Sequence, residues 1–288
     1  MGSRSFLRNL AVAFLIAFLC LPGAAAGAER MKLTVTSPWL FLLSGFIGGA
    51  NVTVVSMQEW NANGDLVRVP RSRAPALTPD DRIMAFDEED ARKLGVTKEK
   101  YPQLSALYDP FPIHGVKLDE ALADPSVLPF VAQRVLTVLA DWDPAGYPYY
   151  QRRLAEFQAR LYSTILAGRQ LLKGQKVYDL TGSSRPLLQA AGCEILSPSE
   201  ADLEAWSAYK GLNALMEQTA RNGEQKIPVV IDFETPKAIR RALVSRTEVF
   251  LLGRPPATQD YPSFLHDQYT SLWLKVISKP LVPPGRKR

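Results

Sequence analysis

The longest run of regularly spaced apolar positions in the chain lies between Asp143 and Gly174. Asp143-Pro144 is typical of a helix start, and Gly174 is typical of a helix end. Between them, apolar side chains and one glycine recur every three or four positions, on what would be one helical face: Tyr150, Leu154, Phe157, Leu161, Ile165, Gly168 and Leu172. The pattern predicts one amphipathic helix about 45 Å long. We interpret it as a strut between two halves of the chain; an ordinary long surface helix is the alternative.

After this helix, short apolar runs alternate four times with segments of helical pattern. Strands are expected at residues 176–180, 193–196, 227–231 and 249–252. Helices are expected to begin at Arg185-Pro186, at a Ser197–Glu200 capping box, at Thr235-Pro236 and at Tyr261. The helix after the capping box should continue to Asn222-Gly223. Four such alternations predict a parallel α/β domain.

The first half of the chain is less regular. Strands are expected at residues 32–36, 52–55 and 83–86, and helices after Ser37-Pro38, Asp87 and Asp124-Pro125. Residues 61–81 have the composition of a long polar loop, and residues 96–119 have no pattern from which an element can be predicted. We therefore expect an α/β fold with two lobes of parallel sheet flanked by helices. The lobes would be residues 29–142 and 175–288, and residues 143–174 would link them as one long backbone helix.

The first 28 residues have the pattern of a secretory signal peptide. Arg4 and Arg8 precede an apolar run from Leu10 to Leu21, and Ala26-Gly27-Ala28 fits a cleavage site. Twelve apolar residues are too few to span a bilayer, which takes about 20. We expect cleavage after Ala28 and a soluble protein in the periplasm. A lipid anchor on Cys20 is the alternative, and it is disfavoured because the preceding leucine is large for a lipoprotein site.

Composition and charge narrow the function classes. The 288 residues are 47% hydrophobic and 22% charged, as in ordinary globular proteins. Cleavage would remove two arginines and lower the formal charge from +5 to +3, which does not favour nucleic acid as a partner. Only Cys193 would remain, so an intrachain disulfide is not expected. Neither a nucleophile elbow, a Walker loop nor a His-Glu-x-x-His motif is present, and we do not expect an enzyme.

Several segments resemble the solute-binding proteins of zinc- and manganese-type ABC importers. Thr34–Pro38 followed by Gly48-Gly49 is similar to the opening strand, helix and glycine of that family. Asp124-Pro125, Asp141–Pro144 and Tyr149-Tyr150 are similar to its approach to the backbone helix. The resemblance implies two lobes with little relative motion, a membrane permease as partner, and a ligand in the cleft at the carboxyl ends of the strands. We expect the protein to be a monomer.

The family resemblance implies a metal site of three histidines and one carboxylate, and this chain departs from it. The loop after Val55 lacks the first histidine, and Glu120 and Thr181 stand at the positions of the other two. Asp232 retains the carboxylate, with Glu234 two residues on. Such an oxygen-rich set, to which Asp65 could add, suits manganese, magnesium or calcium better than zinc.

Further interpretations of these positions stay open. His114 is close enough to Glu120 in sequence to enter the cleft, although a surface loop is the favoured place for it. The hydroxyls and backbone N–H groups of Thr181–Ser184, with Arg185, could instead hold a small anionic ligand at a helix start. Alternatively these residues are a helix cap, and the protein is a scaffold that acts through protein–protein interaction. The leading hypothesis is a periplasmic solute-binding component of an ABC importer, related to metal-ion transport.

Overall fold

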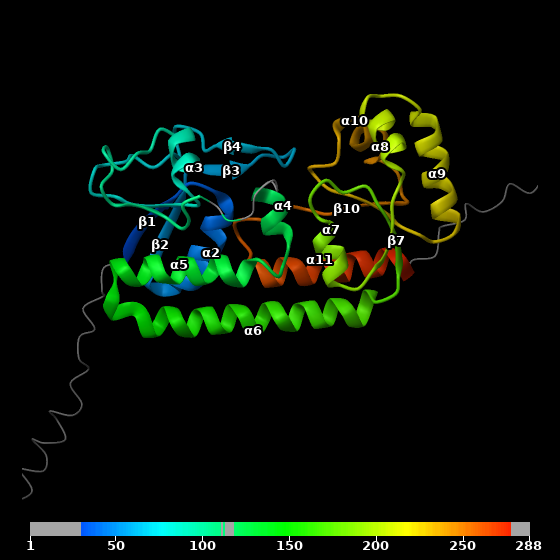
Figure 1. The fold of residues 1–288 in the computed structure, drawn as a ribbon. Helices are drawn as coiled ribbons and strands as arrows, with labels where there is room; N and C mark the ends of the chain where they lie inside the picture. Colours follow the sequence, from blue (N-terminus) through cyan, green and yellow to red (C-terminus); the bar gives the residue numbers. More distant parts are fainter. Residues whose placement is uncertain (1–29, 111, 113–117, 278–288) are drawn as a thin grey trace, which may run out of the picture.

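The computed structural model describes residues 30–110, 112 and 118–277, in which two parallel sheets stand side by side over a layer of long helices (Figure 1). The predicted signal peptide, its cleavage site and His114 lie outside the described residues. The predicted fold class is confirmed: the fold is α/β, with two lobes of parallel sheet flanked by helices.

The sheet of the N-terminal lobe has the strand order β2-β1-β5-β6, with every neighbouring pair parallel. Its strands are β1 (Met31–Val35), β2 (Val52–Ser56), β5 (Arg82–Ala85) and β6 (Leu104–Ala106). The other elements of this lobe are α2 (Pro38–Gly48), η1 (Gly49–Asn51), α3 (Glu88–Lys93), α4 (Leu118–Ala123), α5 (Leu128–Trp142) and the antiparallel hairpin β3 (Gln58–Trp60) and β4 (Leu66–Arg68). As predicted, Ser37 caps α2 and Asp87 caps α3, each by accepting a backbone N–H three residues on.

The C-terminal lobe repeats this arrangement. Its sheet has the order β10-β9-β7-β8, again parallel throughout. Numbered within each lobe, both sheets run 2-1-3-4. The strands are β7 (Lys176–Asp179), β8 (Glu194–Leu196), β9 (Val229–Ile231) and β10 (Val249–Leu251), and the helices are α7 (Arg185–Ala190), α8 (Glu200–Ser207), α9 (Leu212–Glu224), α10 (Lys237–Leu243) and α11 (Tyr261–Ile277).

The long helix α6 (Tyr147–Leu172) runs beneath both lobes and packs against α2 and α5 of the first and α11 of the second (Figure 1). Its buried face is the predicted one, apart from Ile165, which is half-buried. The helix begins later than predicted, because Asp143 caps the short 3-10 turn η2 (Pro144–Gly146) and accepts the Tyr150 hydroxyl at 2.7 Å. None of the described helices is long and apolar enough to cross a membrane.

Four local predictions were wrong, each because a turn or a tertiary contact outweighed the local pattern. The polar segment 61–81 contains β4, which pairs with β3. The Asp124 side chain accepts the backbone N–H of Ser126 in a turn and does not begin a helix; α5 starts only at Leu128. The helix expected over 197–223 is two helices, α8 and α9, separated where Tyr209 and Gly211 have positive φ. Ser199, not Ser197, caps α8.

Candidate functional site

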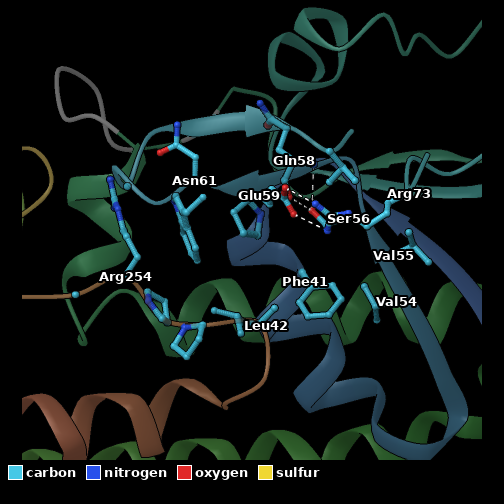
Figure 2. A pocket seen from close by; sticks show the side chains of 18 of the residues that line it. Phe41, Leu42, Val54, Val55, Ser56, Gln58, Glu59, Asn61, Arg73 and Arg254 are labelled. Carbon is cyan, nitrogen blue, oxygen red and sulfur yellow. Dashed lines mark hydrogen bonds and ion pairs between the residues drawn. The ribbon is translucent and has the colours of Figure 1, made fainter. Parts of the chain in front are cut away.

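A pocket of about 600 Å³ lies in the cleft between the two lobes (Figure 2). On one side it is bounded by the carboxyl end of β2 and by α2. On the other side it is bounded by the segments that follow β9 and β10. Both sheets therefore turn their carboxyl ends to it, which is where open α/β sheets hold ligands. The hairpin β3–β4 forms a third wall.

Apolar side chains make most of the wall. They come from four separate segments of the chain and include Phe41, Leu42, Val54, Val55, Phe233 and Pro256. Three are held in place by the core behind them: Leu42 is 7% exposed, and Phe41 and Val54 pack against the large core cluster. The pocket is thus a preformed hollow of the kind that holds small organic molecules.

Each charged side chain of the pocket already has a partner of opposite charge. Arg73 donates two hydrogen bonds to the carboxylate of Glu59, at 2.8 and 3.0 Å, from its two terminal nitrogens. Arg254 donates to Glu234 Oε1 at 2.6 Å, and its guanidinium lies 5.6 Å from the ring centre of Trp60. The Arg254 side chain is only 11% exposed, so this second pair is largely withdrawn from water.

The hairpin tip joins the two lobes beside the pocket. Gly64 has φ +77°, and a Cβ at this position would stand 2.1 Å from Phe233 Cγ. Arg240 donates to the backbone oxygens of Asn63, at 3.2 Å, and Phe233, at 2.8 Å. Only glycine therefore lets the tip lie against the C-terminal lobe, because it has no side chain and accepts this backbone conformation.

The carboxylate of Asp232, a predicted metal ligand at the end of β9, is surrounded by donors of the protein itself. Oδ2 accepts the backbone N–H and the hydroxyl of both Ser183 and Ser184 at 2.9–3.1 Å. Oδ1 accepts the backbone N–H groups of Gly182 and Thr235 and the Thr235 hydroxyl. Burial favours the neutral carboxyl, but these donors together outweigh it and hold the pKa of Asp232 below its ordinary value.

Thr181 and Glu234 lie at the same edge of the sheet and also have partners. The Thr181 hydroxyl donates to Asp179 Oδ1 at 2.6 Å, and Asp179 Oδ2 accepts Arg185 Nε at 2.7 Å. The segment Thr181–Ser184 with Arg185, predicted as a possible anion site, therefore already faces two carboxylates of the chain, Asp179 and Asp232. Glu234 accepts from Arg254.

Two further predicted ligands, Glu120 and Asp65, lie in a short helix and in a turn. Glu120 lies in α4, and Asp65 is an exposed residue of the β3–β4 turn. Over the described ranges, no group of three or more His, Cys, Asp or Glu side chains is arranged to hold a metal ion. The proposed metal set of Glu120, Thr181, Asp232, Glu234 and His114 stays a prediction.

Sequence reasoning missed the residues that form the pocket. Phe233 stands between the two predicted ligands Asp232 and Glu234, and Arg254 follows the fourth strand of its sheet. The signal that could have found them is their place just after strand ends, where both sheets present residues to the cleft. The hairpin gave no such signal, because its polar loop hid β4.

No protein-family model matches the chain, and no curated protein sequence matches it. Solved structures do match. A zinc-bound deletion mutant of ZnuA has a TM-score of 0.60 and 17% identity, over 88% of this chain and 100% of that chain. The laminin-binding protein Lbp of Streptococcus pyogenes has a TM-score of 0.59 and 16% identity, over 86% and 99%.

A third similar structure is a zinc-bound AdcAII variant of Streptococcus pneumoniae, with a TM-score of 0.58 and 14% identity, over 86% of this chain and 100% of that chain. The predicted resemblance to solute-binding proteins of zinc- and manganese-type importers is thereby confirmed for the fold. At these identities the likeness shows the fold and leaves the ligand to be argued from this chain's own residues.

Proposed function

We propose that this chain is the solute-binding component of an ABC-type importer, and that its solute occupies the pocket between the lobes. The proposal rests on one observation: a preformed hollow of about 600 Å³ lies at the carboxyl ends of both sheets. Ligand pockets commonly measure about 300–1,000 Å³ and occur at domain interfaces. In this proposal the protein works in the periplasm, as a monomer without catalytic activity, and delivers its solute to a membrane permease.

A divalent metal ion is the second candidate ligand. Two of the similar solved structures are described as zinc-bound, which favours it. In this chain the site would be the oxygen-rich set of Glu120, Thr181, Asp232 and Glu234, with His114, and would suit manganese better than zinc. To bind metal, Asp232 would have to give up donors that now stabilise its charge, and Glu234 would have to leave Arg254. Both changes would have to be offset by the new metal–oxygen bonds, because each leaves polar groups of the chain without their present partners.

A scaffold that acts only through protein–protein interaction is the third candidate, and the open pocket argues against it. A protein without a small ligand gains nothing from a partly enclosed hollow with mostly apolar walls, because those side chains lose the packing contacts that they would have in a filled core. The hollow is also lined by residues from both lobes, as a site for a solute held between them would be.

The proposal is tested by native mass spectrometry of the mature protein, purified under mild conditions from its own periplasm. We expect a fraction of the molecules to carry one added mass, lost when Val54→Trp fills the pocket. Val244→Trp is the matched control, because Val244 is 56% exposed and lies outside the pocket. An added mass that survives Val54→Trp places the ligand elsewhere. If no added mass is found and no compound of the organism's growth medium raises the melting temperature, the solute-binding proposal is wrong.

A further inference from the structure

The charge balance of the cleft pocket indicates what class of molecule it takes. Its charged lining residues are Glu59, Arg73 and Arg254. Arg73 and Glu59 neutralise each other through a bidentate pair, and Arg254 is neutralised by Glu234, which is not itself a lining residue. Counted with that partner, the pocket carries no net charge. A charged ligand would therefore leave water without meeting an unbalanced charge of opposite sign, which is strongly unfavourable.

Two neutral polar side chains of the wall, Ser56 and Asn61, are occupied within the chain, whereas Trp60 Nε1 is buried without a hydrogen-bond partner among the described residues. The Ser56 hydroxyl donates to the backbone oxygen of Gln58 at 2.6 Å and accepts its N–H. Asn61 Oδ1 accepts the backbone N–H groups of Asn63 and Asp65 and so holds the hairpin turn. The polar atoms of Ser56 and Asn61 therefore hold the wall in place and do not form a set of ligands for a metal ion.

Apolar side chains line the hollow from both lobes. Phe41, Leu42 and Val54 belong to the N-terminal lobe (Figure 2). Phe233 and Pro256 belong to the C-terminal lobe. An apolar ligand that fills this space removes both its own surface and the wall from water, at about 25 cal/mol per Å². A hydrated metal ion would gain nothing from such walls, because it needs several oxygen or nitrogen ligands at about 2–2.6 Å.

We propose that the cleft pocket binds an uncharged, predominantly apolar organic molecule, with Phe41, Val54, Phe233 and Pro256 as its contact surface. This inference rests on the proposed function, since it names the chemical class of the solute. It keeps the proposed role in an importer, but the solute that it names is neither a metal ion nor a small anion.

The test compares two fluorescent probes that differ by one charged group. N-Phenyl-1-naphthylamine is uncharged, and 1-anilinonaphthalene-8-sulfonate has the same rings with a sulfonate added. We expect the uncharged probe to bind one site per full-length mature chain, with its emission shifted to the blue. The sulfonate probe should bind at least about tenfold more weakly. A tenfold difference corresponds to about 1.4 kcal/mol, and burying an uncompensated charge costs more than that.

Variants then locate the bound probe. Val54→Trp and Ala257→Trp both narrow the pocket, and Ala257 is exposed in a loop, so the second change leaves the cores intact if the first does not fold. Each should weaken binding of the uncharged probe by about tenfold or more, as expected for overfilling a packed space. Val244→Trp should leave it unchanged.

The possible outcomes separate the inference from the function on which it rests. If the sulfonate probe binds as tightly as the uncharged probe or more tightly, the solute is not restricted to uncharged molecules, and an anionic solute is favoured. If neither pocket variant weakens binding of the uncharged probe, the probe binds elsewhere and the proposed site is wrong. If the uncharged probe does not bind, but the purified protein carries an added mass that Val54→Trp removes, the solute class is wrong and the cleft still binds the solute. If neither is seen, both proposals fail.

Discussion

Asp232 shows how one residue can be placed correctly by sequence and still leave its role open. Its position after a buried apolar run predicts the edge of the sheet, and the structure has it there, 3% exposed. Most of the donors that surround it lie about 50 positions earlier, at Gly182–Ser184, and no local pattern shows that these two segments meet. A carboxylate at a strand end can bind a ligand or be bound by the chain itself, and only tertiary contacts distinguish the two.

We predict that Asp232→Asn destabilises the fold at neutral pH. The asparagine loses the charge and turns an NH₂ group towards N–H and O–H donors, so the free energy of unfolding should fall by about 3 kcal/mol. Because its folded pKa is lowered, Asp232 contributes stability above its unfolded pKa, about 4, and loses it as the pH falls through the lower folded value. The difference from the parent should therefore shrink below about pH 4.

Urea unfolding at pH 7, 5 and 3.5 measures this difference. Asp80→Asn is the control, because Asp80 is an exposed turn residue, and it should leave the free energy of unfolding within about 0.5 kcal/mol of the parent. A parent-like stability of Asp232→Asn at pH 7 would show that the donors around Asp232 contribute nothing to the fold.

At the scale of elements, periodicity predicted the long helix and its buried face because the apolar spacing of α6 spans seven turns without interruption. It could not predict the start, since Asp143-Pro144 fits a 3-10 turn as well as an α-helix. The short elements β4, β6 and α4 were missed for a related reason: each has three to six residues, too few for a period to show.

The packing of α6 on α11 depends on a glycine, and we predict opposite effects for two glycine-to-alanine changes. A Cβ at Gly168 would stand 2.4 Å from the Tyr269 ring, which is buried and bonded to the Leu187 backbone. Gly168→Ala should lower the free energy of unfolding by about 1–3 kcal/mol despite the better helix propensity. Gly45, in α2, has open space around it, so Gly45→Ala should raise the free energy of unfolding by about 1 kcal/mol. Thermal and urea unfolding compare the pair; equal effects would show that α6 and α11 are not in close contact.

The hairpin contact across the cleft gives a second matched pair. Gly64 and Gly95 have nearly the same φ, +77° and +79°, but only Gly64 faces a neighbour, Phe233. Gly95→Ala should cost about 1 kcal/mol from backbone strain. Gly64→Ala should cost about 1–3 kcal/mol more and weaken binding of the uncharged naphthylamine probe, because the hairpin wall must move. Equal losses in both variants, with unchanged probe binding, would contradict a hairpin tip seated on the C-terminal lobe.

At the scale of the whole molecule, the two-lobed fold was predictable because strand and helix alternate in a regular order. The ligand pocket was not, because its walls come from α2, β2, the hairpin and two segments after strands of the other lobe. Their apolar side chains have the pattern of ordinary core residues, and only the arrangement of the lobes leaves them facing an open space. The resemblance to metal-binding proteins directed attention to Glu120, Thr181 and Asp232, while other residues line the hollow.

The most direct test is a crystal structure of the mature protein purified from its own periplasm, with anomalous data collected at the zinc and manganese edges. We expect density for an organic molecule between Phe41, Val54 and Phe233, and no anomalous peak at Thr181, Asp232 or Glu234. An anomalous peak within about 2.5 Å of the Asp232 or Glu234 oxygens, with only water in the hollow, would contradict this expectation.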